Sequence, residues 1–317
     1  YQAAHLARNA FIKPLLVPEL LLKDDALIKV ESEKNYLRLV SDEYIDISRR
    51  AKLSGRGVKS AVDEMPVQDA IELQPVDIIA GTNRQFWVTV KVPEAAVPGI
   101  YNGNIELVSG DISLGFLPIE LEVLPFKLAP SMLVYSIFHR ARLDDRKPEG
   151  TISSELRSEA QYSAELNNLV AHGITQPNLY QKHNSQMFRR ALELRREAGI
   201  DQRELFLIGL PAVPGEGNTV PAGFGNYVRD TTKKVRPYGV EQLYVWGRDE
   251  AKADRLIEQE KVWAYARELG AKVFVAGYHT TGVTGPGNFD LMGPLHDTFV
   301  AINPVTREES ARWHGIG

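Results

Sequence analysis

The sequence predicts a two-domain protein, in which an antiparallel β-sandwich is followed by an α/β barrel of the (β/α)8 TIM type. Residues 26–128 alternate between apolar and polar side chains, which is typical of strands with one buried face. From residue 133 onward, amphipathic runs end in glycine and pass directly into apolar strands. Repeated helix–strand units of this length predict a parallel sheet.

The composition is that of an ordinary soluble globular protein. The 317 residues, 44% of them hydrophobic, suffice for two domains with separate cores. A net charge of −4 gives no electrostatic reason to expect a nucleic-acid partner. The lack of cysteine excludes disulfides, thiolate metal ligands and a cysteine nucleophile. No stretch reaches the ~20 apolar residues that span a bilayer, so we expect no membrane span.

The first domain contains several short strand candidates. The clearest are residues 45–48, 86–92 and 119–123. Asn102-Gly103 is a tight-turn signal, and residues 109–111 separate two further candidates. We therefore expect a sandwich of about seven or eight strands, with Trp87 in its core. Its exposed strand edges are compatible with a homo-oligomer but do not predict one.

A short, stiff connector marks the predicted domain boundary. Pro125 and Pro130 bracket it, and the strand–turn–strand rhythm stops there. We place the sandwich domain at residues 1–128 and the barrel domain at residues 129–317.

The second domain is predicted to alternate helices and strands. The turning glycines are Gly173, Gly199, Gly239 and Gly270. Strands are expected at residues 133–138, 174–180, 204–210, 242–247, 272–277 and 297–302, and helices at residues 155–171, 184–198, 251–269 and 308–314. A closed barrel needs eight strands. We expect the carboxyl-terminal strands to be missing, and the alternative is an open barrel. The start at Tyr1 indicates that the natural amino terminus is not included.

Two adjacent carboxylates, Asp249 and Glu250, follow the predicted strand at residues 242–247. Barrel enzymes build their active sites at the carboxyl ends of the strands. Neighbouring carboxylates repel each other when both are ionised, which raises the pKa of one and makes it a candidate proton donor. We assign Glu250 as the acid and Asp249 as its partner. The alternative interpretation is that the two residues cap a helix beginning at Ala251.

Aromatic and hydrogen-bonding side chains occur near the other predicted strand ends. They are His139 and Arg140, Asn178 and Tyr180, Tyr244 and Trp246, Tyr278 and His279, and His296 and Asp297. Aromatic rings stack on the apolar face of a pyranose while polar groups bind its hydroxyls, so this set predicts a sugar-binding site. Taken singly, each residue also has a structural interpretation, with Trp246 in the barrel core, Tyr180 in the barrel wall and Arg140 in a salt bridge with Asp144 or Asp145.

Other chemistries find little support in the sequence. The histidines at 139, 279 and 296 lie on separate predicted elements without paired spacing, so we predict no metal site. No phosphate-binding glycine loop follows the first strand of the second domain, and no cofactor is predicted. A Gly-x-Ser-x-Gly motif is also absent from the sequence, which removes the obvious serine hydrolase.

Two stretches of the sequence resemble glycoside hydrolase family 123 and its relatives. Residues 83–93 and 98–103 are similar to the sandwich domain that precedes the barrel in this family. Residues 244–250, followed by a helix and residues 270–275, resemble the strand that bears the family's Asp-Glu catalytic pair. The resemblance extends from about residue 77 onward.

The resemblance implies retaining hydrolysis of a β-linked N-acetylgalactosaminide, with the sugar's own acetamido oxygen as the nucleophile. By analogy, Glu250 protonates the glycosidic oxygen and Asp249 orients the acetamido group. Tyr278 is expected to hydrogen-bond the acetamido oxygen. The family likeness also favours an exported protein with a glycan substrate. Arg248 beside the pair is a departure that bears on activity more than on fold.

Two further hypotheses stay open from the sequence. In the first hypothesis, the chain is a non-catalytic carbohydrate-binding or surface-structural protein on the same scaffold. In the second, it is a retaining glycosidase with Glu250 as the acid and its nucleophile on later strands. Packing of Glu250 into the core, or a short ion pair with Arg248, favours the binding protein.

Overall fold

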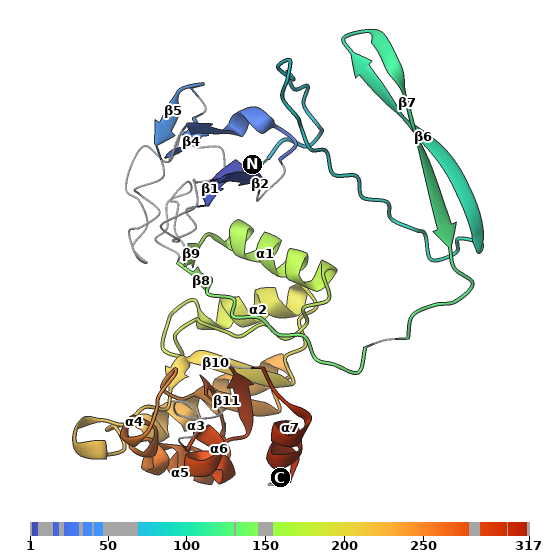
Figure 1. The fold of residues 1–317 in the computed structure, drawn as a ribbon. Helices are drawn as coiled ribbons and strands as arrows, with labels where there is room; N and C mark the ends of the chain where they lie inside the picture. The colour runs from blue at the N-terminus through green and yellow to red at the C-terminus, as the bar shows by residue number, and fades with distance from the viewer. Residues whose placement is uncertain are drawn as a thin grey trace. The chain divides into compact units, whose positions relative to one another are not determined.

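The computed structural model describes residues 2–5, 15–18, 22–31, 34–39, 41–46, 69–129, 131–144, 155–278, 286–302 and 304–315. The chain divides into two units, Tyr1–Asp25 with Asp69–Leu133 and Ala26–Gln68 with Val134–Gly317. The described elements form a mixed α/β protein with several sheets, none of them closed (Figure 1). The predicted boundary after residue 128 remains a prediction.

The first unit contains two antiparallel strand pairs. Strands β1 (Gln2–His5) and β2 (Leu15–Pro18) form one, and β6 (Gly99–Ser109) and β7 (Ile112–Val123) form a long hairpin (Figure 1). Gly110, with φ of 59°, supplies the left-handed turn between β6 and β7. The predicted turn at 109–111 is confirmed. The predicted turn at Asn102-Gly103 is wrong, because Gly103 pairs with Ile119 inside the ladder.

The predicted strand at residues 86–92 is not formed in this structure, and Trp87 lies 74% exposed rather than in a core. A strand requires a neighbour to satisfy its backbone groups, and within the described residues β6 and β7 pair only with each other. The β-sandwich therefore remains a prediction.

The described residues of the second unit form three sheets, two of which are small. A three-stranded antiparallel sheet comprises β3 (Ile28–Glu31), β4 (Lys34–Arg38) and β5 (Tyr44–Asp46), preceded in the chain by the 3-10 turn η1 (Asp25–Leu27). Strands β8 (Arg142–Leu143) and β9 (Leu156–Arg157) form a parallel pair.

The largest sheet is parallel, as predicted. It consists of β10 (Glu204–Pro211), β11 (Gln242–Trp246), β12 (Lys272–Gly277) and β13 (Thr298–Ala301), in chain order. Two extended segments continue this order. The Asn178 amide donates to the Ile137 carbonyl at 3.0 Å, and Leu179 forms a bridge with Leu207 of β10. The expected strands at residues 133–138 and 174–180 thus lie in sequence order, although their ladders are incomplete.

Helices alternate with these strands. They are α1 (Glu159–Ala171), α2 (Phe188–Glu197), α3 (Phe224–Val235), α4 (Asp254–Ile257), α5 (Glu260–Glu268), α6 (Asn288–Met292) and α7 (Arg307–His314), with 3-10 turns η4 (Glu216–Asn218), η5 (Arg236–Tyr238) and η6 (Gly293–Leu295). The four predicted turning glycines all have φ between 81° and 88°, which confirms their role as helix ends. The single helix predicted over 251–269 is wrong, because the chain forms α4 and α5 instead.

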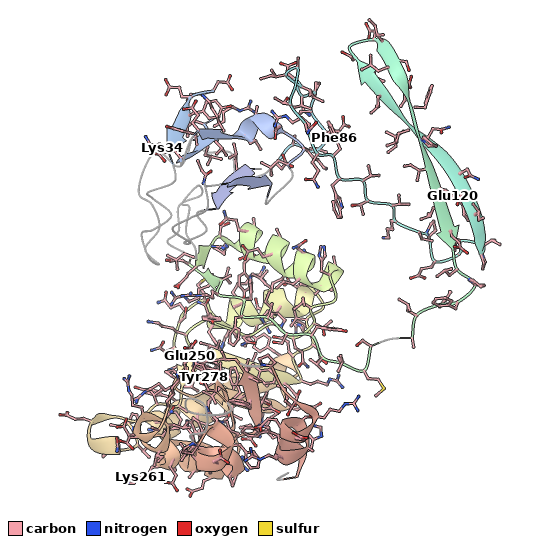
Figure 2. All side chains as sticks on the ribbon, in the orientation of Figure 1. Lys34, Phe86, Glu120, Glu250, Lys261 and Tyr278 are labelled. Carbon is pink, nitrogen blue, oxygen red and sulfur yellow. The ribbon has the colours of Figure 1, made fainter. Side chains whose placement is uncertain are left out.

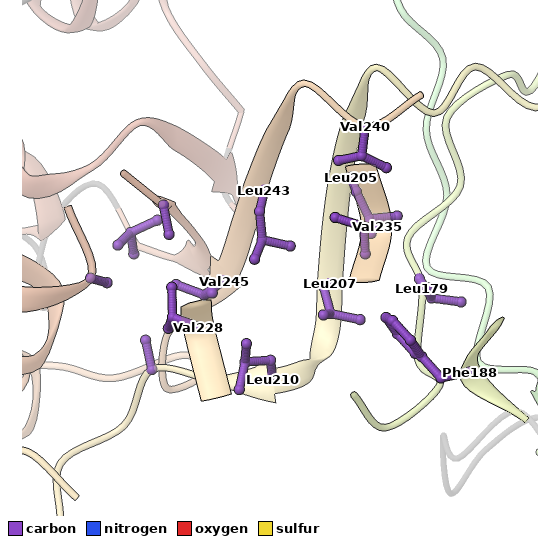
Figure 3. Close-up of a cluster of buried hydrophobic side chains, with 14 of the residues drawn as sticks. Leu179, Phe188, Leu205, Leu207, Leu210, Val228, Val235, Val240, Leu243 and Val245 are labelled. Atoms are coloured by element: carbon purple, nitrogen blue, oxygen red, sulfur yellow. The ribbon is translucent and has the colours of Figure 1, made fainter. Parts of the chain in front are cut away.

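The parallel sheet is apolar on both faces, which is typical of a sheet covered by helices on one side at least. Leu205, Leu207, Leu243 and Val245 belong to the large core shared with the helices (Figure 3). The alternate positions form a second, mainly aromatic cluster on the opposite face. Its members are Phe206, Ile208, Tyr244, Trp246, Phe274, Ala276 and Val300. The two cores fix the orientation of every strand, and therefore of the loops that follow the strands.

Candidate active site

The loop after β11 presents Asp249 and Glu250 to solvent. Both residues are exposed, and they follow Trp246, the last residue of β11, after two intervening positions. Helix α4 does not begin until Asp254, and Ala253 occupies its N-cap position. The alternative interpretation, in which the pair caps a helix beginning at Ala251, is therefore wrong. The carboxylates are free of a capping role.

Packing beneath this loop fixes its course. The Gly247 amide donates to the Phe274 carbonyl at 3.0 Å, and a Cβ at Gly247 would lie 2.6 Å from Cζ2 of the buried Trp263. The next amide, of Arg248, donates to Oε1 of Gln259 at 2.5 Å. Because Gln259 is fully buried, this bond anchors the loop to the interior of the unit.

Glu250 is held at two points by the carboxyl end of β12. Its amide donates to the Ala276 carbonyl at 3.1 Å, and its Oε2 accepts a hydrogen bond from the Tyr278 hydroxyl at 3.2 Å. Figure 2 shows Glu250 and Tyr278 close together. The backbone of Glu250 has φ of 50°, a left-handed conformation that is uncommon outside glycine and asparagine. Such a conformation persists when the surroundings enforce it, and it is frequent at functional sites.

Arg248 does not neutralise the pair through a short ion pair with Glu250. Its guanidinium donates to Glu258 at 3.0 Å. A cation does lie beside the Tyr278 ring: the ammonium of Lys252 is 3.8 Å from the ring centre. The condition that favoured a binding protein, a buried or Arg248-locked Glu250, is therefore not met.

The charges of the site perturb two of its groups. Partial burial, and after it the negative charge of Glu250, raise the pKa of Asp249 above its ordinary value. The charge of Glu250 is the main cause that raises the pKa of Tyr278. Asp249, which the sequence interpretation made the partner of the acid, therefore has an increased proton affinity.

Tyr180 lies within electrostatic reach of this pair. Burial raises the pKa of the Tyr180 phenol, the nearby Arg140 lowers it, and the charge of Asp249 raises it. Arg140 in turn donates to Glu155 at 2.6 Å, the salt bridge foreseen as its structural interpretation, although with a different acidic partner from Asp144 or Asp145. The structure therefore brings Asp249, Glu250, Tyr278 and Tyr180 to one end of the sheet.

Two of the predicted sugar-binding aromatics lie inside the aromatic cluster. Trp246 is 9% exposed and meets the rings of Phe138 and Phe274 edge to face, while Tyr244 stacks on Phe206 at 4.3 Å. The Tyr244 hydroxyl donates to Glu204, the first residue of β10. Its phenol therefore points toward the amino end of the sheet, away from Asp249.

The remaining predicted site residues have other partners. Nε2 of His139 lies 2.9 Å from a Glu165 carboxylate oxygen in α1, and Oδ1 of the buried Asn178 accepts from Ser136 at 3.0 Å. His279 lies outside the described residues. His296 and Asp297 precede β13, so their placement on the rim is wrong; they lie at the amino end because this strand begins only at Thr298.

Sequence reasoning missed three residues that shape the site: Gln259, Lys252 and Asn288. Gln259 and Lys252 carry no local sequence signal, because Gln259 contacts the loop from the N-cap position of α5 and Lys252 contacts a ring that follows β12. Asn288 directly follows the Pro286-Gly287 turn signal and opens α6, a position that favours a polar side chain facing backbone groups. Within the described residues, no group of three or more metal-binding side chains is present.

Comparison with known proteins gives one match, and it lies outside this site. Residues 19–109 match the family model described as the glycoside hydrolase 123 N-terminal domain. The amino-terminal part of the chain is thus similar to a domain of glycoside hydrolases, while the match does not extend to the parallel sheet. No curated protein and no solved structure matches the chain. No described helix is both long enough and apolar enough to cross a membrane.

Proposed function

We propose that this protein is a glycoside hydrolase that acts on glycans with β-linked N-acetylhexosamine residues, such as N-acetylgalactosamine. The observation that carries the proposal is the exposed Asp249–Glu250 pair, held by the end of β12 in a chain whose amino-terminal part matches a glycoside hydrolase domain. Glu250 acts as the acid and base, and Asp249 orients the acetamido group of the substrate. Adjacent carboxylates suit this substrate-assisted route, because an enzyme nucleophile needs a second carboxylate about 5 Å away on the opposite sugar face.

The proposal includes the finer architecture that the sequence predicted. The apolar face of the β6–β7 hairpin, with Ile105, Leu117 and Leu121, supports a second sheet covering it in a sandwich. The six parallel segments in chain order, with aromatic side chains on the face opposite the helices, support the first part of a barrel. The Asp249–Glu250 loop then lies at the mouth of that barrel.

Isosteric variants test the two carboxylates. We expect Glu250→Gln to reduce kcat/KM on an aryl N-acetyl-β-galactosaminide by about 10²–10⁴-fold, the usual contribution of acid–base catalysis. The loss should grow when the aryl leaving group is replaced by an alkyl alcohol, because a poor leaving group depends more on the acid. Asp249→Asn should reduce turnover equally for both leaving groups. The matched control is Glu241→Gln, an exposed glutamate at the opposite end of β11.

Four outcomes distinguish the proposal from its alternatives. Unchanged turnover in Glu250→Gln removes Glu250 from the reaction. Sugar binding without any turnover by the unaltered protein indicates a carbohydrate-binding protein. Equal turnover of substrates with and without the 2-acetamido group indicates an enzyme nucleophile rather than the acetamido oxygen, and inhibition by a thiazoline analogue of the cyclised sugar supports the substrate-assisted route.

The pH dependence of turnover follows from the raised pKa of Asp249. Orientation of the acetamido N–H requires the carboxylate form of Asp249, so kcat/KM should fall as the pH drops through this pKa. Because the pKa lies above the ordinary ~3.9 of aspartate, the fall should begin at a higher pH than for an unperturbed aspartate. An acid limb that is unchanged in Asp249→Asn contradicts this role.

A further inference from the structure

We propose that Asn288 is a positioning residue that holds the Tyr278 hydroxyl on Glu250, and that His296 holds the Asn288 amide in turn. The inference rests on the proposed function, because it assigns supporting residues behind the same acid. Asn288 and His296 form no hydrogen bond with Glu250 themselves and act on it through Tyr278.

The Tyr278 carbonyl is fixed by two donors from one residue. Both the backbone amide and the side-chain Nδ2 of Asn288 donate to it, each at 3.1 Å. Asn288 is 2% exposed and is the first residue of α6. Two bonds from a buried residue fix the direction of the carbonyl, and with it the backbone from which the Tyr278 ring extends toward Glu250.

The residue before Tyr278 leaves room for this amide. A Cβ at Gly277 would lie 2.4 Å from Nδ2 of Asn288, closer than real Cβ contacts allow. Gly277 has no left-handed backbone conformation that would otherwise require glycine. Its lack of a side chain is therefore explained by the space that the Asn288 side chain occupies.

His296 holds the other end of the Asn288 side chain. Because Nδ2 of Asn288 donates to Tyr278, its Oδ1 is the acceptor, and Nε2 of His296 lies 3.2 Å from it, while Nδ1 of His296 lies 3.0 Å from the Met292 carbonyl. A neutral imidazole carries one N–H, so the bond to Asn288 requires the tautomer that is protonated at Nε2. The rings of Trp263, Phe299 and Trp313 surround the imidazole edge to face, at centroid distances of 5.0–5.6 Å. The packed rings prevent the imidazole from swinging away, so the Asn288 amide keeps one orientation.

A spectroscopic readout follows from the charges around Tyr278. The phenol is faced by Glu250, Asp249 and Lys252, and the charge of Glu250 is the largest cause that raises its pKa. The charged neighbour of His296 is Asp297, which accepts the Val273 amide and pairs with Arg267. The titration of Tyr278 therefore reports its distance from Glu250 without any need for glycosidase activity.

The experiment is a pH titration of the protein labelled with ¹³Cζ-tyrosine, with Tyr278→Phe identifying the Tyr278 signal. We expect Asn288→Ala to lower the Tyr278 midpoint toward the ordinary value of tyrosine, because the phenol moves away from the carboxylate. Met292→Leu, a buried apolar change in the same helix, should leave the midpoint unchanged. His296→Phe keeps the ring packing and should cause a smaller shift in the same direction.

The outcomes are decisive without the hydrolase assignment. A Tyr278 midpoint in Asn288→Ala equal to that of the unaltered protein overturns the proposal, and if this variant does not fold, His296→Phe provides the same test. Glu250→Gln must itself lower the midpoint; if it does not, the Tyr278–Glu250 bond is absent in solution and the proposal fails. Where the protein shows turnover, Asn288→Ala should reduce kcat/KM about tenfold in the presence of Tyr278 and have no effect in the Tyr278→Phe background. Lack of turnover in the unaltered protein refutes the proposed function alone.

Discussion

The β6–β7 hairpin and the parallel sheet of β10–β13 both pair their strands, but they differ in how far they bury their apolar side chains. Both have strong apolar patterns and backbone ladders between neighbours, each interrupted by one register shift, between Leu107 and Val108 in the hairpin and between Leu207 and Pro211 in the sheet. The hairpin needs only its own turn at Gly110, and its large apolar side chains such as Leu107 and Leu117 remain more than half exposed. The parallel strands require crossovers, and the crossover helices bury one face of the sheet. Pairing of strands therefore does not by itself produce a core.

The largest expected effect comes from deleting a core side chain in the parallel sheet. Leu207→Ala removes a fully buried side chain of β10 and should lower the free energy of unfolding by about 2–5 kcal/mol, measured by urea denaturation. The matched change in the hairpin, Leu117→Ala, should cost less than about 0.5 kcal/mol if the side chain is 55% exposed in solution, as in this structure, and about 2–5 kcal/mol if the proposed sandwich covers it. A large loss at Leu117 breaks the comparison and indicates that the hairpin face is covered in solution, as a sandwich requires.

The second prediction concerns the turn from β11 into the acidic loop. Gly247→Ala places a methyl group against Trp263 and should destabilise the protein by about 1–3 kcal/mol through overpacking. It should also reduce turnover, because the carboxylates move with the loop. Gly103→Ala in the hairpin, where a Cβ meets nothing within 4 Å, is the control for thermal unfolding and should change the stability little. Equal losses at the two glycines contradict the packing argument.

The pH dependence of stability distinguishes the two regions further. Burial lowers the pKa of His296 to about 4, so the unfolded chain binds the proton more tightly. Stability should therefore fall by about 1.4 kcal/mol for each pH unit between about pH 6 and pH 4, and His296→Phe should remove this part of the slope. Denaturant titrations at several pH values measure the effect. A slope that is the same in His296→Phe shows that other groups cause it.

The smallest expected effect is at the start of α1. The hydroxyl of Ser158 accepts a hydrogen bond from the Gln161 backbone amide, and the Gln161 side-chain oxygen accepts one from the Ser158 backbone amide. Ser158→Ala should lower the stability by about 1 kcal/mol, because it removes this cap. Ser158→Thr, which keeps the hydroxyl, is the control. Thermal unfolding that is the same in Ser158→Ala and Ser158→Thr contradicts the capping role.

Much of the second unit was predictable from local patterns. The turning glycines, the helices near residues 155–171 and 184–198, and four of the six predicted strands appear as expected, because helix ends and apolar runs are encoded within a few residues. The helix over 251–269 was predicted wrongly, since its apolar spacing continues through a break. The buried side chain of Gln259 supports that break by binding the Arg248 amide, a contact that no local pattern specifies.

The candidate site was only partly predictable for a similar reason. Position after a strand correctly brought Asp249, Glu250 and Tyr278 to one end of the sheet. Position along the chain did not distinguish residues in the loop after β11 from residues inside the strand. The rings of Trp246 and Tyr244, which lie within β11 and face inward, were therefore expected on the rim. Alternation along β11 assigns these two residues to the same face, but only the packing of Phe138, Phe206 and Phe274 fills that face and buries them.

The sequence alone determined the parallel order of strands and helices and the place of the acidic pair, because periodicity and glycine stops act over short distances. The tertiary structure decided which groups surround that pair. Three groups line up behind Glu250: the Tyr278 hydroxyl that donates to it, the Asn288 amide and the His296 imidazole. They come from different elements, and Glu250 and His296 are 46 positions apart in the chain. Contacts of that kind depend on the packing of helices against the sheet, which no local pattern in the sequence specifies.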